Sequence, residues 1–88
     1  MYINVKHNID WWEGGIEIDY IIRAFAKKLG MKEGNYSKYQ PRYECLQYED
    51  TTMKQFNTLK RRLNASKKLK VSKKGVEIKL IVEANDVR

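Results

Sequence analysis

The chain has 88 residues, of which 42% are hydrophobic and 33% are charged, and its formal net charge is +7. This length allows a single domain, and the composition is too hydrophobic for a disordered chain. No apolar stretch approaches the roughly 20 residues that cross a bilayer, and the N-terminus lacks the apolar segment of a secretory signal. We therefore expect residues 1–88 to form one cytoplasmic domain that does not enter a membrane.

The first part of the chain predicts a strand and a connection. Residues 2–6 alternate between polar and apolar side chains, which predicts a strand with Ile3 and Val5 on its buried face. Two tryptophans follow, at Trp11 and Trp12. We expect at least one of them to pack against the end of the core, because neighbouring side chains in extended backbone point in opposite directions. The other is a candidate contact for a protein partner.

The clearest helix comes next. Apolar residues recur at helical spacing from Ile18 to Leu29, and two lysines occupy the last turn, where cations favour the helix dipole. Gly30 then stands where a helix is often terminated by a left-handed residue. The pattern predicts a helix that ends near residue 29.

Residues 31–41 are typical of a loop and interleave rings with cations. Tyr36 and Tyr39 flank Lys38, and exposed tyrosines beside a cation can stack on unpaired bases while the cation holds the backbone. The alternative is that the tyrosines cover the edge of the core. These three residues are secondary candidates for nucleic-acid contact.

The second half of the chain predicts a strand, a helix and a hairpin. Residues 42–48 are rich in β-forming residues, and Thr52 with Gln55 fits a capping box that opens a helix. The expected buried face of this helix consists of Met53, Phe56, Leu59 and Leu63. After it, apolar and polar residues alternate on both sides of a Lys74-Gly75 turn, which predicts a hairpin.

The order β-α-β-α-β-β predicts an α+β domain with two layers. We expect a small, mainly antiparallel sheet that carries two amphipathic helices on one face. A winged-helix-like arrangement is the alternative, because a basic helix followed by a basic hairpin resembles a recognition helix and a wing. That arrangement needs a helix in residues 31–41, where the sequence has loop-forming residues. Two copies of the chain could also pair through exposed strand edges, which keeps a homodimer as an alternative.

Catalysis finds no support in the sequence. Cys45 and His7 are the only cysteine and histidine, so no intrachain disulfide and no cysteine-based zinc cluster can form. We expect Cys45 to be a small buried side chain and His7 to be a solvated residue at a strand end. Phosphate-binding glycine loops and a nucleophile elbow are both missing from the sequence, so we predict no enzyme, no metal and no cofactor.

Charge is the strongest functional signal. Residues 54–79 contain ten lysines and arginines and one acid, Glu77, so this segment carries +9 while the rest of the chain carries −2. Such asymmetry attracts anionic partners, and a helix and hairpin rich in cations suit nucleic-acid phosphates. The candidate phosphate contacts are Lys54, Arg61, Arg62, Lys67, Lys68, Lys70, Lys73 and Lys74. We predict non-catalytic binding of DNA or RNA through residues 54–79.

Three other interpretations of the basic segment compete with this prediction. Lysines also keep proteins soluble and protect strand edges, although such surfaces usually mix both signs of charge. A small inhibitor or adaptor that docks on an acidic surface of a protein partner is the alternative function, and small lysine-rich proteins of this kind are often encoded by viruses or mobile elements. Membrane binding is disfavoured, because the core needs the apolar side of the basic helix.

Overall fold

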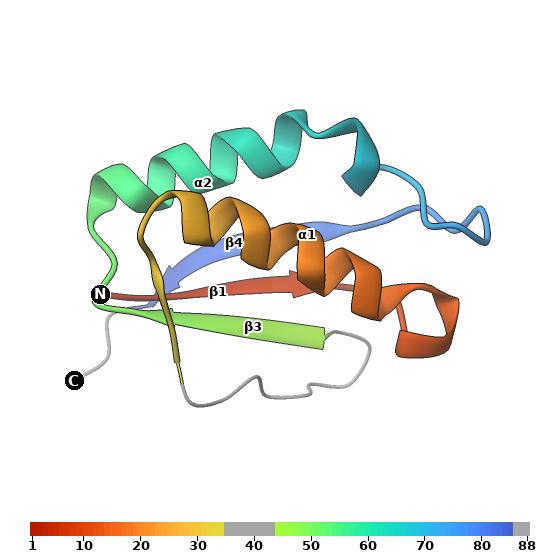
Figure 1. The fold of residues 1–88 in the computed structure, drawn as a ribbon, viewed down its shortest axis with the longest axis horizontal. Coiled ribbons are helices and arrows are strands. Elements are labelled where there is room, and N and C mark those ends of the chain that lie inside the picture. The colour runs from red at the N-terminus through yellow and green to blue at the C-terminus, as the bar shows by residue number, and fades with distance from the viewer. Residues whose placement is uncertain (35–43, 86–88) are drawn as a thin grey trace.

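The computed structural model describes residues 1–34 and 44–85, which form an α+β domain with both helices on one face of a four-stranded sheet (Figure 1). The strands are β1 (Tyr2–His7), β2 (Lys32–Glu33), β3 (Glu44–Glu49) and β4 (Leu80–Asn85). The helices are α1 (Gly15–Lys28) and α2 (Met53–Ala65), with two short 3₁₀ helices, η1 (Trp11–Glu13) and η2 (Lys67–Leu69). The predicted fold class is confirmed.

β1 lies inside the sheet, whose strand order is β2-β3-β1-β4 and whose neighbouring strands are antiparallel. Val5 of β1 faces Leu46 of β3 on one side and Val82 of β4 on the other. With one helix after β1 and the other after β3, this is the β-α-β-β-α-β arrangement of ferredoxin-like domains. Because such folds host many activities, function must be inferred from the surface.

Strand alternation decides which side chains of the sheet meet the helices. Ile3 and Val5 are fully buried beneath them, while Asn4 lies on the opposite, partly exposed face. Ile22 of α1 and Leu59 of α2 are also fully buried and belong to the same core cluster. The apolar rows found in the sequence therefore meet in one core.

α1 ends at the glycine that the sequence indicates. Gly30 has a φ of 69°, its N–H donates to the Lys27 carbonyl at 3.0 Å, and the Met31 N–H donates to the Ala26 carbonyl at 3.1 Å. These two bonds form a Schellman motif, which satisfies carbonyl groups that a helix end leaves free. The predicted end of this helix is confirmed.

α2 begins at the predicted capping box. The Gln55 N–H donates to Thr52 Oγ1 at 3.1 Å, and the Thr52 N–H donates to Gln55 Oε1 at 2.9 Å. Gln55 Nε2 also donates to the Leu29 carbonyl at 3.0 Å and so joins the start of α2 to the end of α1. Met53, expected in the core, is 59% exposed at the first helical position.

The predicted hairpin is reduced to a single bridge between Val71 and Glu77. The Lys74-Gly75 turn is present, and Gly75 has a φ of 82°. Before the turn, however, the chain forms η2 instead of a strand. The reason is Leu69, which is buried in the core and holds the chain in a tight turn at the end of α2.

Residues 32–33 form β2, although the sequence indicates a loop there. Both side chains, Lys32 and Glu33, are exposed, so this edge strand has no hydrophobic pattern and is held by backbone pairing with β3. The predicted strand at residues 42–48 corresponds to β3, and residues 35–43 lie outside the described part of the chain. A strand at residues 32–33, paired into the four-stranded sheet, is incompatible with the winged-helix alternative.

Candidate nucleic-acid interface

α2 presents its cations to solvent because two leucines fix its buried face. Leu59 and Leu63 are almost completely buried, and Lys54, Arg61 and Arg62 are exposed on the rest of the surface. The sequence of α2 contains no acidic residue. Its arginines therefore have no carboxylate within their own helix to neutralise them.

Three more lysines stay close to the end of α2. Lys67 and Lys68 are exposed in η2, which the buried Leu69 anchors to the core. Lys70 Nζ donates to the Asn64 carbonyl at 2.7 Å, where a cation is favoured by the negative end of the helix dipole. This bond holds Lys70 at the end of α2.

The last two cations lie in the turn before β4. The Gly75 N–H donates to the Ser72 carbonyl at 2.9 Å and closes the turn. Lys73 Nζ lies 2.7 Å from Glu17 Oε1 of α1, and both side chains are at least half exposed. Exposed pairs of this kind contribute about 0–1 kcal/mol. Lys74 has no ion-pair partner among residues 1–34 and 44–85.

α2, η2 and the turn follow one another from one end of the domain to the other (Figure 1). We call their cations the cationic strip: Lys54, Arg61, Arg62, Lys67, Lys68, Lys70, Lys73 and Lys74. All eight side chains are exposed. Within the described residues, only Lys73 of this set belongs to an ion pair. The fold thus places the predicted phosphate contacts on successive exposed elements.

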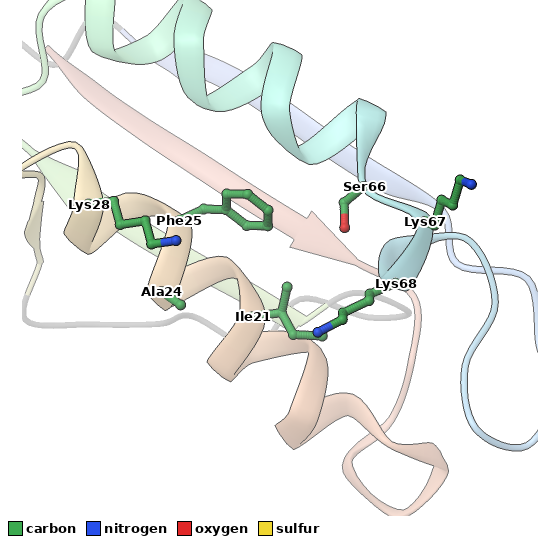
Figure 2. Close-up of a pocket in the computed structure, with 7 residues that line it drawn as sticks. All are labelled: Ile21, Ala24, Phe25, Lys28, Ser66, Lys67 and Lys68. Carbon is green, nitrogen blue, oxygen red and sulfur yellow. The ribbon is translucent and has the colours of Figure 1, made fainter.

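A groove of about 420 Å³ separates α1 from η2 and the end of α2. Its lining residues are Ile21, Ala24, Phe25, Lys28, Ser66, Lys67 and Lys68. Figure 2 shows Phe25 pointing from α1 toward α2 and Lys68 reaching from η2 toward Ile21, whereas Lys67 points away. A neighbouring hollow of about 310 Å³ shares Ile21 and Lys68 with this groove. The groove therefore has an apolar floor and a rim of lysines.

Lys28 is the groove residue that sequence reasoning missed. The sequence suggested only that its charge favours the end of α1, and nothing in the spacing connects it with lysines about 40 positions later. A local signal was present all the same. Ile21, Phe25 and Lys28 are separated by four and three residues, the spacing that places side chains on one helix face.

A second exposed surface lies at the start of α1. It consists of Trp11, Trp12, Ile16 and Tyr20, whose side chains are between 47% and 63% exposed, and we call it the aromatic patch. The two indole rings meet edge to face with centroids 5.7 Å apart, which limits their freedom. Such a concentration of exposed rings on a small domain is typical of a contact surface.

The expectation that one tryptophan closes the core is wrong. Ile9 is fully buried and fills that position, while Trp11 and Trp12 are 62% and 57% exposed. The chain comes so close to itself here that a side chain at Gly15 would collide with the Ile9 carbonyl. The backbone of residues 9–10 is therefore packed against the start of α1, and both tryptophans lie outside the core.

His7 is fully buried, so the expectation of a solvated residue is wrong. Its Nε2 lies 2.7 Å from Asp19 Oδ1, and its Nδ1 accepts the Ile9 N–H at 3.2 Å. A proton on Nε2 that is donated to the carboxylate satisfies both contacts. With both nitrogens engaged in the interior, the ring joins β1 to α1 and is not placed to act as a base on a substrate.

Cys45 is buried, as the sequence predicts. Burial raises the pKa of its thiol, and the charges of Lys6 and Glu83 have smaller, opposing effects. The side chain is therefore a protonated thiol with little access to solvent. Its surroundings are those of a packing residue.

Tyr36, Lys38 and Tyr39, the predicted stacking residues, lie outside the described part of the chain. Within the described residues, no group of three or more histidine, cysteine or acidic side chains could hold a metal ion. Neither α1 nor α2 is long and apolar enough to cross a membrane. Comparisons with protein-family models, with curated proteins and with solved structures found no match, so function is inferred from geometry and charge.

Proposed function

We propose that this protein binds nucleic acid without catalysis, through phosphate contacts along the cationic strip. The observation that carries this proposal is a row of eight exposed cations of which, among the described residues, Lys73 alone faces a carboxylate. Three cations elsewhere in the described residues lie beside carboxylates, for example Arg23 with Glu33 at 2.8 Å. The excess positive charge of the strip is thus available to an anionic partner.

The chemistry of the strip suits phosphates. A guanidinium group can donate two parallel hydrogen bonds to phosphate oxygens, and Arg61 and Arg62 are neighbours on the exposed side of α2. The lysines of η2 and the turn act as flexible point charges that follow an irregular backbone. Each phosphate that they neutralise releases counterions, which supplies most of the affinity that does not depend on base sequence.

The test is a titration of labelled duplex DNA, single-stranded DNA and RNA, followed by fluorescence anisotropy at several salt concentrations. We expect the logarithm of the binding constant to fall linearly with the logarithm of salt concentration. The slope should be about −0.9 per neutralised phosphate on a duplex and about −0.7 on a single strand. Absence of binding at low salt, or binding that salt does not weaken, would contradict the proposal.

A second candidate function is docking on a protein partner, as a small inhibitor or adaptor, and the aromatic patch favours it. Tryptophan and tyrosine are enriched among the residues that dominate protein interfaces. The matched test is a pull-down with three baits: the natural chain, Trp11→Ala/Trp12→Ala, and Arg61→Glu/Arg62→Glu. A partner retained by the arginine variant and lost by the tryptophan variant would support docking through the patch. The opposite pattern would place the contact on the cationic strip.

A further inference from the structure

We propose that the groove between α1 and η2 holds one unpaired base of a bound strand, while the phosphates of that strand contact the lysines of its rim. This inference rests on the proposed function and adds a preference for single strands over duplexes. It concerns a part of the surface that differs from the cationic strip in having an apolar floor.

The floor offers a surface for the flat face of a base. Ile21 and Phe25 pack against the core and still line the groove, so one side of each remains available to a ligand. Ala24 is exposed between them and leaves room because its side chain is small. The volume of about 420 Å³ lies within the range of small-molecule sites, roughly 300–1,000 Å³. Aromatic and apolar side chains stack on bases with little regard to sequence.

The lysines at the rim of the groove favour a negatively charged ligand. The charged residues that line the groove are Lys28, Lys67 and Lys68. The side chain of Lys67 points away, so Lys28 and Lys68 supply the positive charge at the rim. Among residues 1–34 and 44–85, no carboxylate lines this groove, whereas in the neighbouring hollow Glu17 is present and paired with Lys73. A ligand that matches this arrangement has an apolar, flat body and an anionic edge. A nucleotide unit has both.

The groove can accept only a base that has left its helix. In a duplex the flat faces of the bases are covered by their neighbours, and proteins reach only their edges. In an unpaired strand a base can turn outward and stack on a ring such as that of Phe25. Lys67 and Lys68 belong to both the groove and the cationic strip, so a strand bound along α2 and η2 passes the mouth of the groove.

The experiment compares three labelled probes of equal length: a thymidine single strand, a strand of abasic deoxyribose phosphates, and a duplex. All three carry phosphates, but only the thymidine strand offers unpaired bases. We expect the natural chain to bind the thymidine strand about tenfold more tightly than the abasic strand, a factor within the contribution of one stacked base. The duplex should bind with an affinity close to that of the abasic strand.

Two variants separate the groove from the strip. Ala24→Leu fills the floor without changing charge, and leucine suits an exposed helical position, so the fold should persist, as circular dichroism can verify. We expect this variant to lose the preference for the thymidine strand and to keep its affinity for the abasic strand and the duplex. Lys28→Gln should weaken thymidine binding more than Lys27→Gln, a neighbouring exposed cation that does not line the groove.

Equal binding of thymidine and abasic strands by the natural chain would overturn this inference and leave the phosphate contacts standing. Full preference for thymidine in folded Ala24→Leu would overturn it as well. Absence of binding to all three probes would remove the proposed function and this inference together. Binding of an acidic amphipathic peptide, lost in Ala24→Leu, by a protein that ignores the thymidine strand would assign the groove to a protein partner instead.

Discussion

Charged side chains are arranged in two contrasting ways in this domain. Around α1 and the sheet, three cations lie beside carboxylates, in the pairs Lys6–Glu83, Arg23–Glu33 and Lys32–Glu49, while Lys27 and Lys28 at the end of α1 have no such partner among the described residues. Along the cationic strip, Lys73 is the one cation with such a partner among the described residues. Paired charges join elements of the fold, while unpaired charges create a field that reaches outside it. Substitutions in the paired region should therefore change stability, and substitutions in the strip should change binding.

The largest expected effect is on binding. Arg61→Glu/Arg62→Glu should weaken nucleic-acid affinity at least about tenfold at moderate salt, because it replaces two attractive phosphate contacts by two repulsive charges. The free energy of unfolding should change little, since both side chains are exposed. Anisotropy titrations and urea unfolding measure the two quantities.

Lys27→Glu/Lys32→Glu is the control for net charge. It makes the same total change of charge at two exposed sites outside the strip. Affinity within about threefold of that of the natural chain is expected, because neither side chain is a proposed phosphate contact and salt weakens the effect of exposed charges that do not touch a phosphate. Comparable losses in both double variants would mean that net charge, and not the strip, governs binding.

The opposite result is expected in the paired region. Asp19→Ala removes the partner of the buried His7 Nε2 and should lower the free energy of unfolding by about 1–3 kcal/mol, with little change in nucleic-acid affinity. Glu17→Ala on the same helix breaks an exposed pair and should lower it by less than about 1 kcal/mol. Urea unfolding of the two variants side by side measures both losses of unfolding free energy. Equal losses would show that the His7–Asp19 contact contributes no more than an exposed pair.

Patterns local in sequence predicted most of the fold. β1, α1 and α2 are visible because each buries a row of apolar residues, and the capping box and Gly30 mark ends that the backbone hydrogen bonds confirm. The short strand β2 was missed because it exposes both side chains and depends on pairing with β3. The strand predicted around residue 69 is absent. The chain forms η2 there, with Leu69 buried in the core.

Contacts distant in sequence limit what could be predicted of the candidate site. The cations of the strip follow one another along the chain, so composition alone brings them together. The groove, by contrast, requires Lys28 of α1 and Lys68 of η2 to line the same hollow, which only the path of the chain reveals. The partner of His7 was missed for a similar reason, since Asp19 reaches it from α1 only after the helix has packed on the sheet.

A smaller effect concerns a buried polar group of the sheet, the hydroxyl of Tyr48 in β3. The Tyr48 hydroxyl is buried and has no hydrogen-bond partner in the part of the chain that the structure describes, and burial raises the pKa of this tyrosine. Tyr48→Phe removes a group that water would otherwise solvate, so we expect the free energy of unfolding to rise by about 1 kcal/mol. A thermal melt of both proteins measures it, and a clear loss of stability would show that the hydroxyl does find a partner in solution.

The smallest expected effect tests whether an ion pair within the domain makes a lysine less available to nucleic acid. Lys73 and Lys74 are neighbours in the same turn and both are exposed, but Lys73 has Glu17 at 2.7 Å. Lys74→Ala should weaken binding about twofold and make the salt slope shallower by about 0.7–0.9, the loss of one phosphate contact. Lys73→Ala should do less, because part of its charge is already neutralised, and Glu17→Gln should strengthen binding slightly by releasing it. Identical effects of the two lysine variants, with no gain from Glu17→Gln, would mean that the exposed pair opens freely when a phosphate arrives. In that case the contrast between paired and unpaired cations would hold only where the pair is shielded from solvent.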